Sequence, residues 1–348
     1  LRELEQRKFP HASPLLGHLE LRHERGAVTT VGIVQHFVPN EGDAWAFTLD
    51  NVQRFFERVV THRSRTAHVP PFPRDILVRA QRECPEVVRD YVGAYLDVAK
   101  LLGQRTAELH AALAANKEQP SFAPDSYGAL SKRSFYQSLR NLASRSFDAL
   151  RETMPKLSEA DTELAKSVLK RERQIRGRLK HVLERELGGQ RIRCHGDYHL
   201  GQILYTGKDF VIIDFEGEPL RSLTDRRRKR SPMADVAGML RSFHYAVYGV
   251  LSGELPGSQT RPEDVPVLEL WAPVWYAWVA SSFLGAYLKA IESAELLPTT
   301  RDALELLLDV HLIEKSLYEL NYELNNRPSW VRVPLRGILD VLDAEAPK

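Results

Sequence analysis

The stretch RCHGDYHLGQILYTGKDFVIIDFEGE, residues 193–218, is the part of the chain around which the fold is organised. Two short runs rich in apolar and β-branched residues, 203–205 and 210–213, flank the turn sequence TGKD at 206–209. This pattern predicts a β-hairpin. Polar and charged side chains gather just outside the two strands, so the hairpin is predicted to be a rigid platform for chemistry.

Three polar residues around this hairpin have a spacing that is typical of phosphoryl transfer. Asp197 precedes the first strand, Gln202 stands at its start, and Asp214 follows the second strand. A hairpin would bring Gln202 and Asp214 to the same end. Phosphoryl transfer needs a carboxylate that orients or deprotonates the attacking hydroxyl, and oxygen ligands for Mg²⁺. Asp197 suits the first role, and Gln202 with Asp214 suits the second, in the order of the protein-kinase pattern.

Neighbouring residues of the same segment have ordinary structural interpretations as well. His195 alone is more often a satisfied structural histidine, and a glycine such as Gly196 often serves only to permit a tight backbone. Their combination with an amide, a hairpin and Asp214-Phe215-Glu216 favours a functional site. His199 is predicted either to contact nucleotide phosphate or to brace the loop, and the sequence does not separate these two roles.

The composition is that of an ordinary globular protein. The chain has 348 residues, 43% of them hydrophobic, with 48 basic and 46 acidic side chains. This near balance argues against a nucleic-acid or membrane-surface partner. No apolar run approaches the roughly 20 residues of a membrane helix. Only Cys84 and Cys194 are present, so we expect a reduced protein in the cytoplasm.

One local charge feature stands out, the basic run DRRRKR at residues 225–230. The run lacks interleaved aromatic residues, which makes nucleic-acid binding an unfavoured interpretation. It follows Asp214 closely, so it is predicted to form either a solvated loop or a loop near the phosphates or the sugar.

Three regions follow one another along the chain. Residues 1–37 combine the end of a helix with two strands, 17–22 and 29–37, which should pair antiparallel. The turn-rich segment 38–43 is a predicted hinge. Residues 44–348 are predicted to be mainly helical apart from the hairpin. Apolar periodicity predicts helices from residue 43 to at least 59, and over 85–115, 127–154, 159–186, 234–251, 265–293 and 300–325.

Several motifs of the sequence resemble those of a known superfamily. The motifs HGDYHLGQIL (195–204), DFEGEP (214–219) and SPMADVAGMLRSFHYA (231–246) resemble the aminoglycoside phosphotransferase-like kinases, and their fuller wording is similar to bacterial maltokinases. Further similar segments extend the resemblance over nearly the whole chain, namely FPHASPLLGHLE (9–20), VPNEGDAWAFTLD (38–50), LGQRTAELHAAL (102–113) and EKSLYELNYELNNRPSWVRVPLRGI (314–338).

This resemblance implies an α+β, protein-kinase-like bilobal fold with a truncated β-containing N-lobe and a large helical C-lobe. It implies transfer of the ATP γ-phosphate, with Mg²⁺, to the anomeric hydroxyl of maltose, giving maltose 1-phosphate for α-glucan synthesis. Asp197 would be the catalytic base, and Gln202 and Asp214 would ligate the metal. Most related kinases have Asn where this chain has Gln202. Covalent fusion to trehalose synthase, or a complex with it, is also implied.

The resemblance also implies where nucleotide should bind. Gln35, Phe37 and Val38 would read the adenine edge at the hinge, with His195 and His199 near the phosphates. A kinase N-lobe further needs a strand lysine and a helix glutamate. Lys8, Glu3 and Glu5 fit these roles poorly. Because the chain begins with Leu rather than Met, we expect the missing pair to precede it, and this fragment alone to be inactive.

The sugar is expected on the predicted helix 300–325 and just beyond it. Aromatic rings stack on sugars and carboxylates accept hydrogen bonds from hydroxyls. Packing of the tyrosines and pairing of the carboxylates with Lys315 or Arg327 is the competing interpretation. The candidate sugar contacts are Tyr318, Tyr322, Glu319, Glu323 and Arg327. Glu216, Asp235 and Arg241 are predicted to support the site, Asp235 and Arg241 by anchoring the catalytic loop through buried hydrogen bonds.

Two other functions stay open at this point. Another small-molecule kinase of the same superfamily would act on an aminoglycoside or a choline-like acceptor, and a cationic acceptor should demand an acidic cluster. A non-catalytic module of a fused trehalose synthase would not need the complete set of Asp197, Gln202 and Asp214.

Overall fold

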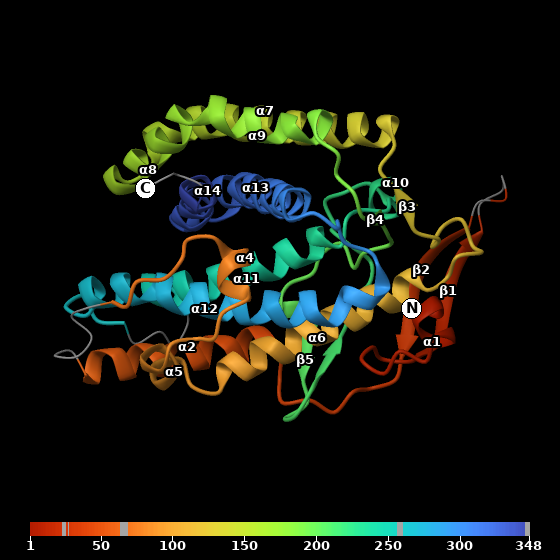
Figure 1. Cartoon of the computed structure of the whole chain (residues 1–348), viewed down its shortest axis with the longest axis horizontal. Helices are drawn as coiled ribbons and strands as arrows, with labels where there is room; N and C mark the ends of the chain where they lie inside the picture. Colours follow the sequence, from red (N-terminus) through yellow and green to blue (C-terminus); the bar gives the residue numbers. More distant parts are fainter. Residues whose placement is uncertain (23–25, 27, 63–68, 256–259, 345–348) are drawn as a thin grey trace.

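The computed structural model describes residues 1–22, 26, 28–62, 69–255 and 260–344. Figure 1 shows a large helical region with a two-stranded sheet, β1 and β2, at one end beside the N-terminus. Helices α7 and α9 form an outer layer over α13 and α14, and α12, α6 and α2 lie on the other side. The predicted mainly helical α+β architecture is therefore confirmed.

The described elements follow the predicted order, with some added detail. The strands are β1 (Leu15–Arg22), β2 (Val28–Gln35), β3 (Asp125–Ser126), β4 (Gln190–Arg191), β5 (Ile203–Tyr205) and β6 (Phe210–Ile212). The helices are α1 (Arg2–Gln6), α2 (Ala44–Thr61), α4 (Ile76–Ala80), α5 (Glu86–Val92), α6 (Tyr95–Ala114), α7 (Ala129–Thr153), α8 (Glu159–Lys170), α9 (Glu172–Glu184), α10 (Leu223–Arg226), α11 (Met233–Ser252), α12 (Val265–Ile291), α13 (Arg301–Asn326) and α14 (Arg332–Ala344).

The structure divides two helices that the periodicity predicts as continuous. The segment 85–115 breaks at Gly93, whose positive φ of 70° ends α5 before α6 begins. The segment 159–186 breaks at Arg171, with φ −96° and ψ 7°. In both cases the apolar pattern continues across the break, which is why periodicity alone does not detect it. The sequence also did not predict α14, which carries Pro334 near its first turn, a tolerated position.

The core lies where α6 and α12 pack together. Gly103 of α6 is in close contact with α12, because a Cβ atom there would lie 2.2 Å from the carbonyl oxygen of Phe283. Three tryptophans of α12 lie in this core, and Trp271, Trp275 and Trp278 are only 1%, 0% and 3% exposed. Although α12 is strongly apolar, no helix among the described residues combines the length and apolarity that crossing a membrane would need.

The β5–β6 hairpin is wider than its own two strands. Strands β5 and β6 pair antiparallel, as predicted. Residue Ala12 forms a parallel bridge with Ile212 on one edge, and Asp43 forms an antiparallel bridge with Leu204 on the other. The two ends of the segment that contains β1 and β2 are therefore both attached to the hairpin. Asp43 also caps α2, since its Oδ1 accepts a hydrogen bond from the Ala46 amide at 2.8 Å.

The β1–β2 sheet is antiparallel, as predicted, and leaves many apolar side chains open to solvent. Among the described residues of this region, large apolar side chains with exposures from 42% to 76% are Leu16, Leu19, Leu21, Val28, Val31, Ile33, Val34 and Phe37. They contribute little to the core, so the stability of the described fold rests on the helical region.

Gly103→Ala is expected to lower the free energy of unfolding by about 1–3 kcal/mol, because the added methyl would force α6 and α12 apart. Gly177→Ala on α9 is the matched control, since a Cβ atom there meets nothing within 4 Å. That control should stabilise by about 0.5–1 kcal/mol through the helix preference of Ala. Urea denaturation of both variants measures the difference, and equal stabilities would contradict the close α6–α12 contact.

Candidate active site

The hairpin brings Gln202 and Asp214 together at its open end. The Gln202 side-chain amide donates to Asp214 Oδ2 at 2.8 Å, and the Ile213 backbone amide donates to the Gln202 carbonyl at 3.0 Å. Asp214 has φ +61°, the left-handed region that costs a non-glycine residue free energy and that is often found at functional sites. The expected side-by-side placement of these two residues is thus observed.

The loop before the hairpin is anchored by one buried carboxylate on α11. Asp235 is 2% exposed and accepts from the backbone amides of His195 at 2.7 Å and Gly196 at 3.0 Å. His110 Nε2 lies 3.2 Å from the same carboxylate. Burial alone would raise the pKa of Asp235, but the hydrogen bond with His110 and the other polar neighbours hold that pKa below its ordinary value.

His195 joins the loop to the end of β6. Its Nε2 donates to the Ile213 carbonyl at 2.8 Å, and its ring packs 5.0 Å from that of Phe215. Burial lowers the pKa of His195, so the imidazole is neutral. The ring is 2% exposed and its polar contacts are with the protein, so its geometry suits positioning of the loop better than the predicted contact with phosphate.

Asp197, the predicted base, lies between one cation and one imidazole. Lys315 Nζ of α13 is 3.5 Å from Asp197 Oδ1, and His199 Nε2 is 3.7 Å from Oδ2. His199 Nδ1 accepts from the Gly201 amide at 3.1 Å, so His199 braces the loop, one of its two predicted roles. Burial alone would raise the pKa of Asp197, but His199 and Lys315 outweigh it and hold that pKa well below its ordinary range.

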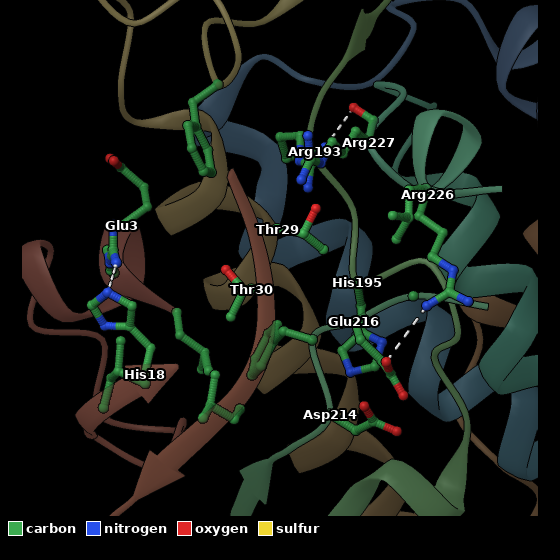
Figure 2. A pocket seen from close by; sticks show the side chains of 18 of the residues that line it. Glu3, His18, Thr29, Thr30, Arg193, His195, Asp214, Glu216, Arg226 and Arg227 are labelled. Atoms are coloured by element: carbon green, nitrogen blue, oxygen red, sulfur yellow. Dashed lines mark hydrogen bonds and ion pairs between the residues drawn. The ribbon is translucent and has the colours of Figure 1, made fainter. Parts of the chain in front are cut away.

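One large cavity opens beside Asp214 towards the sheet, as Figure 2 shows. We call it the β-side cavity, and it measures about 910 Å³. Its walls come from α1, β2 and the segments 193–195, 214–217 and 223–227. The side chains of Arg193, Arg226 and Arg227 bring positive charge to it, so the cavity can accommodate an anionic ligand next to Asp214.

A second cavity lies on the other side of the loop, and we call it the helix-side cleft. It measures about 1120 Å³ and is lined by α7, by the segment 220–231 and by α13. A small recess of about 40 Å³, lined by Asp197, shares several of its wall residues. The shared residues are Arg221, Arg230, His311, Glu314 and Tyr318. Asp197 therefore lies at a recess beside the helix-side cleft, whereas Asp214 lines the β-side cavity.

The predicted sugar residues separate into two groups. Tyr318 lines the helix-side cleft, with Lys315 Nζ 5.2 Å from its ring centre, and burial and a hydrogen bond with Glu218 raise its pKa. Glu319 and Glu323 instead point into the contact between α11 and α13. Glu319 pairs with Arg241 at 2.8 Å, while Glu323 accepts from Arg327 at 2.8 Å and from Tyr245 at 3.1 Å. The competing interpretation, pairing of Glu323 with Arg327, is the one observed.

Tyr322 is 41% exposed, and none of Tyr322, Glu319, Glu323 and Arg327 lines either cavity. The structure thus does not bring these four residues to Asp197. A helix face is set by residues three and four apart, and the face of α13 that turns to Asp197 carries His311, Glu314, Lys315 and Tyr318. Only packing selects between neighbouring faces of one helix.

The predicted hinge residues also lie away from the two cavities. The Gln35 side chain donates to the Ser13 carbonyl at 3.0 Å, and the Val38 carbonyl accepts from the Asn40 side chain at 2.8 Å. Phe37 is 76% exposed. None of these three residues lines the β-side cavity beside Asp214, so their role in nucleotide binding stays a prediction.

Of the predicted supporting residues, Arg241 is the one that the structure places elsewhere. Its guanidinium contacts Glu319 and the Val333 carbonyl, at 3.4 Å from the latter, rather than the catalytic loop. It fastens α11 to α13 and α14 instead. Glu216 lies at the β-side cavity, 3.5 Å from Arg226 Nη1.

The basic run is fixed at its C-terminal end, while Arg227 and Arg228 are exposed to solvent. Arg230 Nη2 lies 2.5 Å from Glu314 Oε2, and Arg221 lies 3.5 Å from the other oxygen of that carboxylate. Lys229 contacts Asp125 at 3.0 Å. These contacts tie the segment after the hairpin to α13 and to residues before α7. Residues of the run therefore line both cavities, and its closeness to phosphate or sugar stays a prediction.

The residues around Asp214 fit a magnesium ion presented by a nucleotide. The described residues contain no group of three or more His, Cys, Asp or Glu side chains that could hold a metal by itself. Mg²⁺ does not need one, because it typically takes one or two protein carboxylates together with phosphate oxygens and waters. The Asp214 carboxylate and the Gln202 side-chain oxygen supply hard oxygen donors of this kind.

Comparison with protein families supports this chemistry. Residues 86–244, from the start of α5 into α11, match the family described as the phosphotransferase enzyme family, APH. The matched region contains Asp197, Gln202, Asp214 and Asp235. This part of the chain, somewhat less than half of its length, is similar to that family.

Two curated proteins are similar in sequence. The glucosamine kinase of Streptacidiphilus jiangxiensis is 27% identical over 247 residues, which cover 70% of this chain and 49% of the relative. The glucosamine kinase of Mycolicibacterium smegmatis (strain ATCC 700084 / mc(2)155) is 26% identical over 260 residues, which cover 73% of this chain and 56% of the relative. The chain thus spans about half the length of the curated relatives it matches.

Solved structures establish the fold class. A glucosamine kinase in complex with glucosamine, ADP and inorganic phosphate matches with a TM-score of 0.68 at 23% identity, covering 98% of this chain and 71% of that one. Another glucosamine kinase structure, crystal form B, matches with a TM-score of 0.67 at 23% identity, covering 98% and 70%. The predicted kinase-like α+β fold is confirmed. The finer likeness to maltokinases is not reflected in these relatives, which are glucosamine kinases.

Asp235→Asn is expected to lower the free energy of unfolding by about 3 kcal/mol at neutral pH, because it weakens a buried acceptor of several hydrogen bonds. The lowered pKa of Asp235 stabilises the fold above the ordinary carboxyl pKa, and this stability is lost as the pH falls through the folded value. The variant should therefore lose less stability than the wild type below about pH 4.

Urea denaturation at a series of pH values measures both effects. Asp340→Asn is the matched control, since Asp340 also contacts a buried histidine, His244, but its side chain is 57% exposed. That control should change stability by no more than about 1 kcal/mol. Equal losses in the two variants would show that Asp235 does not anchor the loop.

Proposed function

We propose that the protein is an ATP-dependent small-molecule kinase that phosphorylates a sugar hydroxyl. One observation carries this proposal: Asp197 lines a recess that shares wall residues with the helix-side cleft, Asp214 lines the β-side cavity, and one short hairpin segment joins them. Gln202 donates a hydrogen bond to Asp214 and so lies behind it. A phosphate donor in one cavity and an acceptor in the other would meet at this segment. The match to the phosphotransferase family supports the same reaction.

The chain's own residues suit each part of the reaction. The acceptor hydroxyl oxygen forms a bond to the γ-phosphorus as the bond from that phosphorus to the bridging oxygen breaks, so ADP leaves with the bond electrons. Asp197 accepts the hydroxyl hydrogen bond and takes the proton as the transfer completes. Because the pKa of Asp197 is held low, the carboxylate stays ionised, and its main work is orientation of the hydroxyl. Such a role suits a loose transition state.

Asp214 and Gln202 would hold Mg²⁺. When bound, the ion would neutralise part of the negative charge on the phosphoryl group that is transferred. Arg193, Arg226 and Arg227 line the β-side cavity and add positive charge near that position.

An amino sugar is the first candidate acceptor, because the curated relatives are glucosamine kinases. By analogy with those relatives, the acceptor would be a monosaccharide with an amino group. The polar wall of the helix-side cleft, with Ser134, Ser138 and Asn141 of α7 opposite Tyr318 of α13, suits a carbohydrate in general.

A neutral disaccharide such as maltose is the second candidate, and the charge of the cleft favours it. The described wall carries more cations than carboxylates, and a protonated amine would be repelled by this excess. The cations are Arg145, Arg191, Arg221, Arg227, Arg228, Lys229 and Arg230, and the carboxylates are Asp125, Asp225 and Glu314. The resemblance of the catalytic motifs to maltokinases supports the same acceptor. Fusion to trehalose synthase remains a prediction.

Asp197→Asn is expected to lower kcat by about 100-fold or more, because it removes the proton acceptor and keeps the size of the side chain. ADP release from the full-length protein with glucosamine, maltose, glucose and kanamycin measures the reaction and the acceptor together. Asp148→Asn is the control, an α7 carboxylate whose side chain is 76% exposed. Undiminished ADP release from Asp197→Asn would refute the catalytic assignment, and none from the wild type would favour a non-catalytic module.

Arg145→Glu tests how the cleft selects its acceptor. Arg145 has no ion-pair partner among the described residues and lines the cleft, so reversing its charge should favour a cationic ligand. We expect the ratio of kcat/KM for protonated glucosamine to that for maltose to rise about 5-fold. Arg140→Glu, also on the exposed side of α7 but outside the cleft wall, is the control. A wild-type preference for glucosamine that Arg145→Glu leaves unchanged would contradict a cation-excluding cleft.

A further inference from the structure

The hairpin that carries Gln202 and Asp214 is too small to fix its own position. Strands β5 and β6 have three residues each. A two-stranded hairpin of this size is marginal by itself, so its geometry must come from neighbouring elements. The question is which side chains hold it, and α6 supplies them.

The turn of the hairpin is clamped to α6 by a bidentate ion pair. Arg105 Nε donates to Asp209 Oδ1 at 2.8 Å, and Arg105 Nη2 donates to Asp209 Oδ2 at 2.7 Å. Two parallel hydrogen bonds of this kind fix orientation as well as distance. The side chains are 15% and 29% exposed, so solvent screens the pair only in part. The hydrogen bond with Asp209 raises the pKa of Arg105, and the guanidinium stays charged.

The same turn is closed from within. Asp209 Oδ1 also accepts from the Phe210 amide at 2.8 Å, and the Thr206 hydroxyl accepts from the Asp209 amide at 3.2 Å. Asp209 therefore connects the turn backbone to the Arg105 guanidinium. Any movement of Arg105 would be passed directly to the start of β6.

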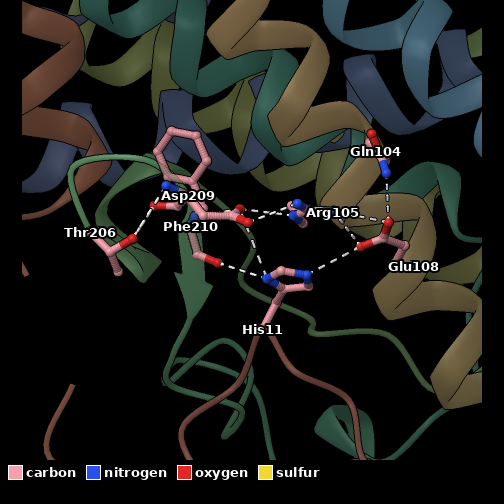
Figure 3. Close-up of polar contacts among 7 residues, drawn as sticks. All are labelled: His11, Gln104, Arg105, Glu108, Thr206, Asp209 and Phe210. Carbon is pink, nitrogen blue, oxygen red and sulfur yellow. Dashed lines mark hydrogen bonds and ion pairs between the residues drawn. The ribbon is translucent and has the colours of Figure 1, made fainter. Parts of the chain in front are cut away.

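Figure 3 shows that this clamp extends to the segment between α1 and β1. His11 Nε2 lies 3.5 Å from Glu108 Oε2, and its Nδ1 lies 3.3 Å from the Phe210 carbonyl and 3.9 Å from Asp209. Glu108 in turn contacts Arg105 at 3.0 Å. The His11 carbonyl accepts from the Ile212 amide at 2.8 Å. The cluster thus joins α6, the hairpin and the N-terminal segment at one point.

Further along, α6 contacts the catalytic loop as well. The Thr106 hydroxyl lies 2.9 Å from that of Tyr198, the residue after Asp197. One turn later, His110 reaches Asp235, which holds the loop backbone. A single helix therefore touches both the loop that carries the proposed base and the hairpin that carries the proposed metal ligands.

We propose that Arg105 is a positioning residue, which sets Asp214 and Gln202 relative to Asp197 by holding the hairpin turn on α6. This inference rests on the proposed function for its consequence in metal binding, but not for its structural part. Arg105 does not line either cavity, so it acts through the residues that it contacts, chiefly Asp209.

Arg105→Gln is expected to weaken Mn²⁺ binding about 10-fold, as loss of a supporting contact behind a metal ligand typically does. Electron paramagnetic resonance titration of the full-length protein with Mn²⁺ in the presence of ADP measures this affinity directly. Hydrogen–deuterium exchange gives the second readout, and the amides of residues 203–212 should exchange about 10-fold faster in the variant, because the clamp limits local opening. Asp209→Asn removes the same pair from the other side and should reproduce both changes.

Two further variants separate positioning from general destabilisation. Arg178→Gln is the matched control, since Arg178 is 8% exposed and joins α9 to Asp309 of α13 at 3.3 Å, away from the hairpin. It should leave both readouts within about 2-fold of the wild type. Arg105→Lys keeps the charge without the planar fork and should give an intermediate Mn²⁺ affinity.

The outcomes distinguish the two proposals. Hairpin exchange in Arg105→Gln that equals that of Arg178→Gln would overturn the positioning role, and so would unchanged Mn²⁺ affinity in a protein that binds Mn²⁺. A wild-type protein that binds no Mn²⁺ with ADP, yet shows faster hairpin exchange on Arg105→Gln, would overturn the proposed metal site and support the clamp.

Discussion

The site depends on one buried carboxylate. The Asp235 carboxylate accepts hydrogen bonds from the backbone amides of His195 and Gly196, and so it orients the backbone just before Asp197. A buried carboxylate is tolerated only when its oxygens are satisfied, and here the loop amides and His110 satisfy them. The loop and α11 therefore depend on each other. Gly238 adds to this constraint, because a Cβ atom there would lie 2.5 Å from the Tyr198 carbonyl oxygen.

The hairpin is a connecting element as well as a carrier of ligands. Its edges pair with residues Ala12 and Asp43, which are the two ends of the segment that forms the β1–β2 sheet. Movement of that sheet would therefore reach Asp214 through backbone hydrogen bonds. The clamp on α6 resists this movement at the turn, so the two constraints act at different places on the same hairpin.

The two cavities divide the proposed reaction between different kinds of structure. The β-side cavity is bounded by a sheet and by arginines from the segments around the hairpin, and the helix-side cleft is bounded by α7 and α13. Relatives with a similar fold are glucosamine kinases, yet the described cleft is rich in cations. A protein that binds protonated amines should have fewer cations in the wall of this cleft. The charge of the wall is therefore the property in which such a protein and this chain should differ.

The sequence alone determined the local elements and the polar residues that they carry. The tertiary structure decided which of these residues come together at the site. The hairpin, the pairing of Gln202 with Asp214 and the helical character of the chain followed from short-range patterns, because turns and periodicity are local. The face of α13 was not local information: Tyr318 reaches the cleft, while Glu319 and Glu323 bind Arg241 and Arg327. Contacts such as Lys315 with Asp197 and Arg105 with Asp209 join residues more than 100 positions apart. Only the packing of the helices brings such residues together.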